Sequence, residues 1–481
     1  MERTSLRLPR SVPEAQGISS AAVIDFLKAI QERELELHSL MLLRHGQVVA
    51  EGWWAPYAPH LPHMLFSLSK SFTSSAIGFA AAEGKLTLDD AVVSYFPEEV
   101  PEEADPNLAA MTIRHLLMMG TGHDKDTLSL LQQREDGNWA KAFLSAPVEH
   151  VPGTHFVYNS GATYMLSAIL QKASGQTLLD YLRPRLLEPL GIEGATWESC
   201  PRGVHTGGWG LSVATEDIAK FGQLYLQKGV WNGKQLLSEA WIEEATSKQI
   251  ANGDGGESDW AQGYGYQFWR CRHGLYRGDG AFGQFCIVMP ERDAVLAITS
   301  GTNDMQGVMN AAWEHLLPPM ASSPLAPDLE LQAELNAALQ ELALRPPGLR
   351  PISPAEAVVG GKAYQLEDNA YQWESVSVSF EADKAIVAIG KANGEHRLTA
   401  GRGEWAEGAS RLLNDAADAC VVASFTWPEE NTLELTTRYI ETPFAFTSRI
   451  RFEDEGERIE MINLSNVMPE QPAIRGLETR E

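Results

Sequence analysis

The order of the predicted secondary structure constrains this fold more than any other feature of the sequence. Residues 38–43 and 47–53 have the apolar patterns of two strands joined by a tight turn. Strand patterns return only at 264–270, 283–289 and 294–300, after a long interval of helical patterns. Strands from both ends of such a segment can join one antiparallel sheet, while the middle forms a helical lobe. The order therefore predicts an α+β fold, because strands and helices do not alternate regularly.

The predicted helices have amphipathic or Ala-rich sequences with recognisable ends. The first begins near Ser19 and Ser20, and Gly84 provides a C-cap for an Ala-rich helix at 67–83. This Ala-rich helix is apolar over most of its length, so we expect it to be buried. Further helices are predicted at 113–119, 161–174, 178–187 and 215–228.

The last third of the chain has a different pattern. A Pro-rich linker at 318–324 precedes a charged helix at 328–344. From residue 362 onward, short alternating stretches predict a separate all-β unit, either a barrel or a sandwich. Its predicted strands are at 375–380, 385–389, 420–427, 432–439, 444–452 and 459–462. We therefore expect an α+β domain at 1–318, a linker and helix at 319–350, and an all-β domain at 351–481.

Charge and composition exclude several classes of partner. The chain has 38 Lys and Arg against 64 Asp and Glu, a formal net charge of -26, which disfavours binding to nucleic acid or to anionic membranes. No stretch approaches the roughly 20 apolar residues of a membrane span, and the N-terminus lacks the apolar core of a secretory signal. The four cysteines are far apart, without metal-ligand spacing. We expect a cytoplasmic protein with reduced thiols; its oligomeric state is not predicted.

The first motif that indicates a catalytic function is Ser67-Leu68-Ser69-Lys70. Residues three apart share a helix face, so the Lys70 amine can return to the Ser67 hydroxyl one turn earlier. A lysine buried in an apolar helix has a lowered pKa, and its neutral form can take the serine proton. The Ser67 N–H, at a helix start, is free to stabilise an oxyanion.

Two later segments have the polar groups that such a nucleophile needs. Tyr158-Asn159-Ser160 follows a Pro-Gly turn, and the Tyr158 phenol could relay a proton near Ser67 and Lys70. Taken alone, Tyr158 is better explained as a buried structural tyrosine whose hydroxyl bonds to the backbone. Gly278-Asp279-Gly280-Ala281 is a glycine-rich strand edge that permits close approach to a substrate, and the Ala281 N–H is the predicted second oxyanion donor.

Together these segments resemble the serine β-lactamase and penicillin-binding protein superfamily, whose motifs are Ser-x-x-Lys, Tyr-x-Asn and Lys-Thr-Gly. The branch most similar contains class C β-lactamases, DD-peptidases and related carboxylesterases. Ser67 to Lys70 match the first motif fully. Tyr158 to Ser160 match the second without its final Asn, and Gly278 to Gly280 keep only the last glycine of the third. The resemblance covers residues 10 to 318 and implies an antiparallel sheet flanked by helices, beside an all-helical lobe.

The resemblance implies a serine hydrolase without a metal or organic cofactor. Ser67, Lys70 and Tyr158 would be catalytic, Ser67 and Ala281 would form the oxyanion hole, and Ser160 and Gly278 to Gly280 would bind substrate. The third motif lacks its lysine, and Asp279 would repel a substrate carboxylate. We therefore expect a small-molecule ester or amide substrate rather than a penicillin.

Two other functions remain open from the sequence. The altered second and third motifs are compatible with a catalytically weakened protein that retains its cleft to bind a ligand or peptide. A Ser-His-Asp hydrolase is less well supported, because the chain has no Gly-x-Ser-x-Gly motif. His115, His123, His155 and His273 also have no evident pairing with a nucleophilic serine.

Overall fold

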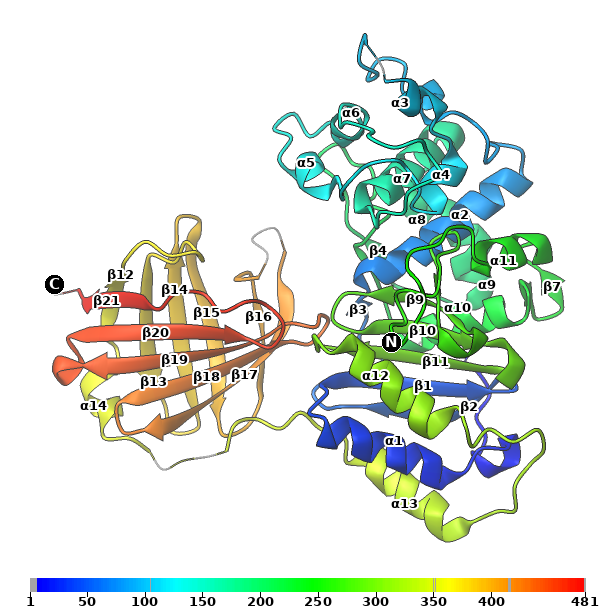
Figure 1. The fold of residues 1–481 in the computed structure, drawn as a ribbon. Helices are drawn as coiled ribbons and strands as arrows, with labels where there is room; N and C mark the ends of the chain where they lie inside the picture. The colour runs from blue at the N-terminus through cyan, green and yellow to red at the C-terminus, as the bar shows by residue number, and fades with distance from the viewer. Residues whose placement is uncertain (1–6, 104, 349, 351, 414–416, 480–481) are drawn as a thin grey trace. The chain divides into compact units, whose positions relative to one another are not determined.

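The computed structural model describes residues 7–103, 105–348, 350, 352–413 and 417–479 (Figure 1). The chain divides into two compact units, each built from several segments. The first unit runs up to Gly52 and continues through Pro62–Ser300 and Asp304–Gln340. The second comprises Trp53–Leu61, Gly301–Asn303 and Glu341–Glu481.

A six-stranded sheet forms the centre of the first unit, in the order β2-β1-β11-β10-β9-β8. Strand β1 pairs antiparallel with β11, from Leu37 opposite Ser300 to Arg44 opposite Ala294. Strands β1, β10 and β11 are buried along their whole length, because helices cover both faces of the sheet. The strands are β1 (Leu37–Arg44), β2 (Gln47–Trp53), β8 (Trp269–Arg270), β9 (Tyr276–Gly280), β10 (Gln284–Met289) and β11 (Ala294–Ser300).

The helices of this unit fall into two groups. Some pack on the sheet: α10 contacts β10 and β11, and α1 contacts α12 and α13. Others form the helical lobe, in which α2 packs against α7 (Figure 1). The bounds are α1 (Ser20–Glu32), α2 (Ser69–Ala82), α3 (Pro106–Ala110), α4 (Ile113–Leu117), α5 (Leu128–Gln132), α6 (Trp139–Leu144), α7 (Ser160–Ser174), α8 (Leu178–Leu182), α9 (Glu188–Leu190), α10 (Thr215–Leu226), α11 (Glu239–Thr246), α12 (Met305–Ala311) and α13 (Leu329–Gln340).

Two predicted elements differ in the structure. The helix expected at 67–83 begins at Ser69 and follows a 3-10 turn at Phe66–Leu68. The strand expected at 264–270 is limited to Trp269–Arg270, because Gln267 has a left-handed φ of 65° that interrupts extended backbone. The helix predicted at 328–344 is α13, which packs on α1 in the first unit.

A small sheet lies directly before the Ser67 turn. Strand β3 (His63–Met64) pairs with β5 (Leu211–Val213), and β5 pairs with β4 (Thr196–Trp197). The pairing continues past β3, because the Leu65 N–H donates to the Leu211 carbonyl at 2.9 Å. The chain that enters the turn is therefore anchored to the segment before α10.

The second unit is rich in strands, as the sequence predicts. Its ten-stranded sheet has the order β15-β14-β13-β12-β21-β20-β19-β18-β17-β16, and β15 also pairs with β17, so the sheet closes on itself. Four of its strands, β12, β15, β16 and β21, were not predicted. The strands are β12 (Ala363–Leu366), β13 (Ser375–Phe380), β14 (Lys384–Lys391), β15 (Gly394–Arg402), β16 (Ala406–Ser410), β17 (Ala419–Glu429), β18 (Thr432–Tyr439), β19 (Ala445–Glu453), β20 (Arg458–Ser465) and β21 (Ile474–Glu478).

Within the described residues, every helix is too short or too polar to cross a lipid bilayer.

Candidate active site

Ser67 lies in the 3-10 turn that leads into α2. The preceding residue, Phe66, has a left-handed φ of 48°, which turns the chain sharply between β3 and the helix. Side chains three residues apart nearly eclipse in a 3-10 turn. This geometry places the Lys70 amine beside the Ser67 hydroxyl, with Nζ 3.0 Å from Oγ.

The Lys70 amine is enclosed by neutral oxygen atoms. It is 1% exposed, and its Nζ donates to the Ser160 Oγ at 3.2 Å and to the Gly208 carbonyl at 2.7 Å. With Ser67, these groups match the three hydrogen atoms of an ammonium group. None of the three partners has a charge that would balance a protonated lysine.

The surroundings shift the pKa of Lys70 toward neutrality. Burial lowers the pKa to about 7, although the negative charges of Asp126 and Asp279 act in the opposite direction. Near neutral pH, a large fraction of Lys70 is therefore an uncharged amine that can accept a proton. The site thus places an amine that can accept a proton in contact with the Ser67 hydroxyl.

Tyr158 approaches the same two residues. Its ring centre lies 4.8 Å from the Lys70 Nζ, and its hydroxyl hydrogen-bonds with Ser67. The ring stacks on Trp269, with 5.1 Å between centroids. The surrounding protein raises the pKa of Tyr158 well above its usual value, so the phenol is neutral and can donate a proton.

The N-terminus of α7 fixes the residues around Tyr158. The Asn159 side chain caps the helix, because its Oδ1 accepts from the N–H groups of Gly161 at 3.0 Å and Ala162 at 3.3 Å. The same oxygen accepts from the Thr127 hydroxyl at 2.9 Å. Asn159 therefore ties α7 to a neighbouring loop, and Tyr158 and Ser160 on either side of it are held in place.

The glycines of β9 allow the sheet edge to approach the nucleophile. A Cβ at Gly280 would lie 2.0 Å from the Leu65 carbonyl oxygen, and one at Gly278 would lie 2.5 Å from the Ser71 Oγ. A side chain at Gly280 would therefore require the backbone to move, and one at Gly278 would displace the side chains of Leu68 and Ser71. Ala281 follows directly, in the turn between β9 and β10.

Asp279 is less open to substrate than the sequence suggested. The residue is 5% exposed, and its Oδ2 accepts from the Nε of Arg277 at 2.9 Å. Arg277 is itself fully buried. The Arg277 charge offsets the negative charge of Asp279, so direct repulsion of a substrate carboxylate is weaker than expected. A substrate-binding role for Asp279 remains a prediction.

The structure brings the predicted catalytic groups together and adds two that were not predicted. Lys70 contacts Ser67, Tyr158 and Ser160, and Tyr158 also contacts Ser67; Ser160 was predicted to bind substrate. Asp126 was missed, although its Oδ1 accepts from the Ser160 N–H at 2.9 Å. Gly208 was missed as well, and its only signal was the Gly-Gly pair at 207–208. Their roles depend on tertiary contacts.

Comparisons with known proteins show which family and which sequences this chain is similar to. The family model described as Beta-lactamase matches residues 25–317. A 6-aminohexanoate-dimer hydrolase of Paenarthrobacter ureafaciens is 26% identical over 285 residues, which cover 55% of this chain and 73% of that protein. A beta-lactamase of Escherichia coli K12 is 26% identical over 215 residues, 40% of this chain and 54% of that protein.

Solved structures share the fold. A putative 6-aminohexanoate-dimer hydrolase from Bacillus anthracis has a TM-score of 0.54 at 22% identity, covering 65% of this chain and 89% of that one. A penicillin-binding protein homologue from Caulobacter crescentus has a TM-score of 0.51 at 18% identity, covering 65% and 100%. The octameric penicillin-binding protein homologue from Pyrococcus abyssi has a TM-score of 0.50 at 17% identity, covering 94% and 99%.

Proposed function

This chain belongs to the beta-lactamase family, and we propose that it is a serine hydrolase that cleaves an ester or amide bond of a small molecule through an acyl-enzyme on Ser67. The family match at 25–317 contains every residue of the candidate site and confirms the resemblance expected from the three motifs. One observation carries the proposal: the buried amine of Lys70, with its pKa lowered to about 7, lies 3.0 Å from the Ser67 hydroxyl.

In the proposed acylation step, the Ser67 oxygen attacks the substrate carbonyl carbon while Lys70 takes the hydroxyl proton. The N–H groups of Ser67 and Ala281 stabilise the resulting oxyanion, and a donor of this kind typically contributes ~3 kcal/mol to transition-state stabilisation. The bond to the leaving group then breaks, and that group receives the proton held by Lys70, either directly or through Tyr158, which donates its own proton and takes one from Lys70. The product is an ester of Ser67 with the acyl part of the substrate.

In the proposed deacylation step, water attacks the acyl carbon of this ester. Lys70, neutral again, takes a proton from the water, and the Ser67 oxygen leaves and is reprotonated. Tyr158 supports both steps as a neutral donor, because its raised pKa disfavours the phenolate. Ser160 and Gly208 hold the Lys70 amine in line with Ser67 throughout.

The third motif limits the substrate class that we propose. Position 278 is a glycine without the family's cationic side chain, and Arg277 is fully buried and paired with Asp279. No cation of this strand is thus free to bind a carboxylate, which favours neutral or cationic esters and amides over penicillins. The name of the Paenarthrobacter ureafaciens relative gives a 6-aminohexanoate dimer as its substrate, which supports including linear amides among the compounds tested.

Intact-protein mass spectrometry tests the proposal. We expect one fluorophosphonate adduct per chain in the wild type and none in Ser67→Ala. Ser74→Ala is the matched control on the same helix, because the buried Ser74 hydroxyl has no hydrogen-bond partner among the described residues, so its loss leaves the site intact. With p-nitrophenyl esters and p-nitroanilides, Ser67→Ala should lower kcat/KM at least ~10³-fold.

Unchanged turnover in Ser67→Ala would contradict the nucleophile assignment. A wild type that forms no adduct would favour the binding-protein alternative, in which the site retains a ligand without cleaving it. Incubation with a penicillin is a separate experiment. A penicillin adduct on Ser67 would contradict the proposed substrate class but would still support Ser67 as the nucleophile.

A further inference from the structure

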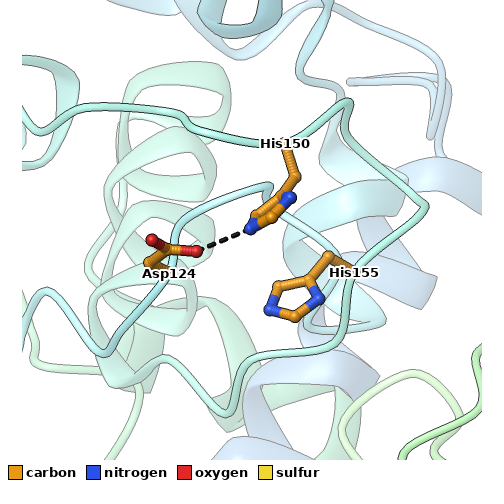
Figure 2. Close-up of side chains that lie close together, drawn as sticks. All are labelled: Asp124, His150 and His155. Carbon is orange, nitrogen blue, oxygen red and sulfur yellow. Dashed lines mark hydrogen bonds and ion pairs between the residues drawn. The ribbon is translucent and has the colours of Figure 1, made fainter.

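We propose that Asp124, His150 and His155 form a binding site for a divalent transition-metal ion of the Zn²⁺ type. The three side chains gather on neighbouring loops of the helical lobe, as Figure 2 shows. One potential ligand atom from each lies within 4.8 Å of the other two. The imidazole rings of His150 and His155 are 4.2 Å apart between centroids, and the His150 Nε2 is 2.6 Å from the Asp124 Oδ1.

The donor set fits zinc chemistry. Two imidazole nitrogens and one carboxylate oxygen are ligands that Zn²⁺ takes at ~2.0–2.2 Å, with water in the fourth position of a tetrahedron. Ligand atoms of such a tetrahedron are about 3.4 Å apart. The Asp124 Oδ1 and the His150 Nε2 are already closer than this distance. They would move slightly apart when a metal ion replaces the proton between them. Rotation of the His155 side chain would bring in the third ligand.

The backbone around the cluster is tied together before any metal binds. The His150 N–H donates to the Gly122 carbonyl at 2.9 Å, and the Gly153 N–H donates to the Gly120 carbonyl at 2.7 Å. Gly122 is required for this approach, because a Cβ there would lie 2.2 Å from the His150 carbonyl oxygen. The loops that supply the ligands are therefore held side by side by main-chain contacts, which reduces the ordering cost of binding.

An ordinary surface ion pair accounts for less of this arrangement. An exposed Asp124–His150 pair contributes little to stability, and it gives no role to His155. A shared metal ion, by contrast, uses both neighbouring imidazoles as ligands. The Glu149 carboxylate accepts from the Asp124 N–H at 3.1 Å and adds negative charge beside the cluster. The acidic chain as a whole also attracts cations.

The site is separate from the hydrolase machinery but shares its scaffold. Asp124 precedes Asp126 by two residues, and His155 precedes Tyr158 by three. A bound ion would join the two loops that lead into these residues and so reduce their motion. The proposed ion has a structural role, and the proposal does not depend on the hydrolase function.

Calorimetric titration of ZnCl2 into the full-length, untagged, EDTA-treated protein tests the site. We expect one Zn²⁺ per chain with a Kd in the micromolar range or below. His150→Gln and His155→Gln should each weaken binding at least ~10-fold. His60→Gln is the matched control, because His60 is an exposed histidine outside the cluster. Asp124→Asn keeps the size of the side chain and should weaken binding while leaving the fold unchanged.

Co²⁺ in place of Zn²⁺ gives a second readout. A tetrahedral site with two imidazole ligands should give intense visible absorption in the wild type and in His60→Gln, and weak absorption in the His150 and His155 variants. Melting curves of the metal-free variants establish that each is folded. A wild type that binds no Zn²⁺ at this stoichiometry would overturn the proposal. So would His150→Gln and His155→Gln variants that are folded and bind as tightly as the wild type.

Discussion

Two buried lysines of this chain differ in what surrounds them. Lys220 is 1% exposed, and its Nζ lies 3.3 Å from the Asp217 carboxylate, which balances its charge. Lys70 is equally buried, but its hydrogen-bond partners are two serine hydroxyls and a carbonyl. Burial without a partner of opposite charge destabilises the protonated amine. At the scale of the residue, this difference separates a structural lysine from a proposed general base.

The pH dependence of hydrolysis follows from this lysine. The pKa of Lys70 is lowered to about 7, so the fraction of neutral base rises as the pH increases through 7. We expect kcat/KM for a neutral ester to rise about tenfold per pH unit below pH 7 and to level off above it. Lys70→Arg should be inactive throughout, because arginine stays protonated. The same profile with the same midpoint in a Lys70 variant would contradict this assignment.

At the scale of the element, the first turn of α7 connects stability to the site. Asn159 caps the helix through its Oδ1 and is fully buried. Its neighbours Tyr158 and Ser160 both contact the nucleophile or its base. A cap usually affects stability alone. Here the same side chain also positions two polar groups of the candidate site.

Asn159→Ala should therefore have two effects. Loss of the cap and of the bond to Thr127 should lower the free energy of unfolding by ~1–3 kcal/mol, measured by denaturant titration. The kcat/KM should fall as well, because Tyr158 and Ser160 are positioned less firmly without the Asn159 hydrogen bonds. The matched control is Asn138→Ala. It removes the hydrogen bond by which the Asn138 Oδ1 accepts from the Lys141 N–H and caps α6, so it should reduce stability without lowering kcat/KM. Equal kinetic effects of the two variants would contradict a positioning role for Asn159.

At the scale of the whole molecule, the second unit is assembled from distant parts of the chain. The segment Trp53–Leu61 follows β2 of the first unit but belongs to the second. The Ala55 N–H donates to the Leu342 carbonyl at 3.0 Å, and the buried Tyr57 hydroxyl donates to the Thr442 carbonyl at 3.1 Å. The strand-rich unit therefore contains a segment that lies more than 300 residues before its strands.

Tyr57→Ala tests this dependence in the full-length chain. Removing a buried aromatic side chain typically costs ~3–5 kcal/mol, so hydrogen exchange should accelerate in β17, β18 and β19. Tyr57→Phe is the matched control, because it removes only the hydrogen bond and should cost ~0.5–1.5 kcal/mol. Exchange rates in these strands that are unchanged in Tyr57→Ala would mean that the second unit is stable without this segment.

The sequence by itself determined the features that depend on local spacing. The Ser67–Lys70 contact follows from residues three apart at the start of a helix. The placement of β1 and β11 in one antiparallel sheet follows from strand patterns at the two ends of a helical interval. Four strands of the second unit were missed, because their polar and apolar residues alternate weakly. Gln267 could not be identified as a break in a strand, because its left-handed backbone is supported by tertiary contacts.

Only the tertiary structure decided which groups surround these local features. Asp126 and Gly208 are far from Lys70 in the sequence, and packing of the helical lobe against α2 brings them to it. Arg277 and Asp279 are two residues apart on β9, so their ion pair is local, whereas the burial of both side chains depends on the fold. Spacing along the chain fixes which residues share a helix face or a strand face. Charge balance and burial depend on residues that meet only after folding, and they set the pKa of Lys70.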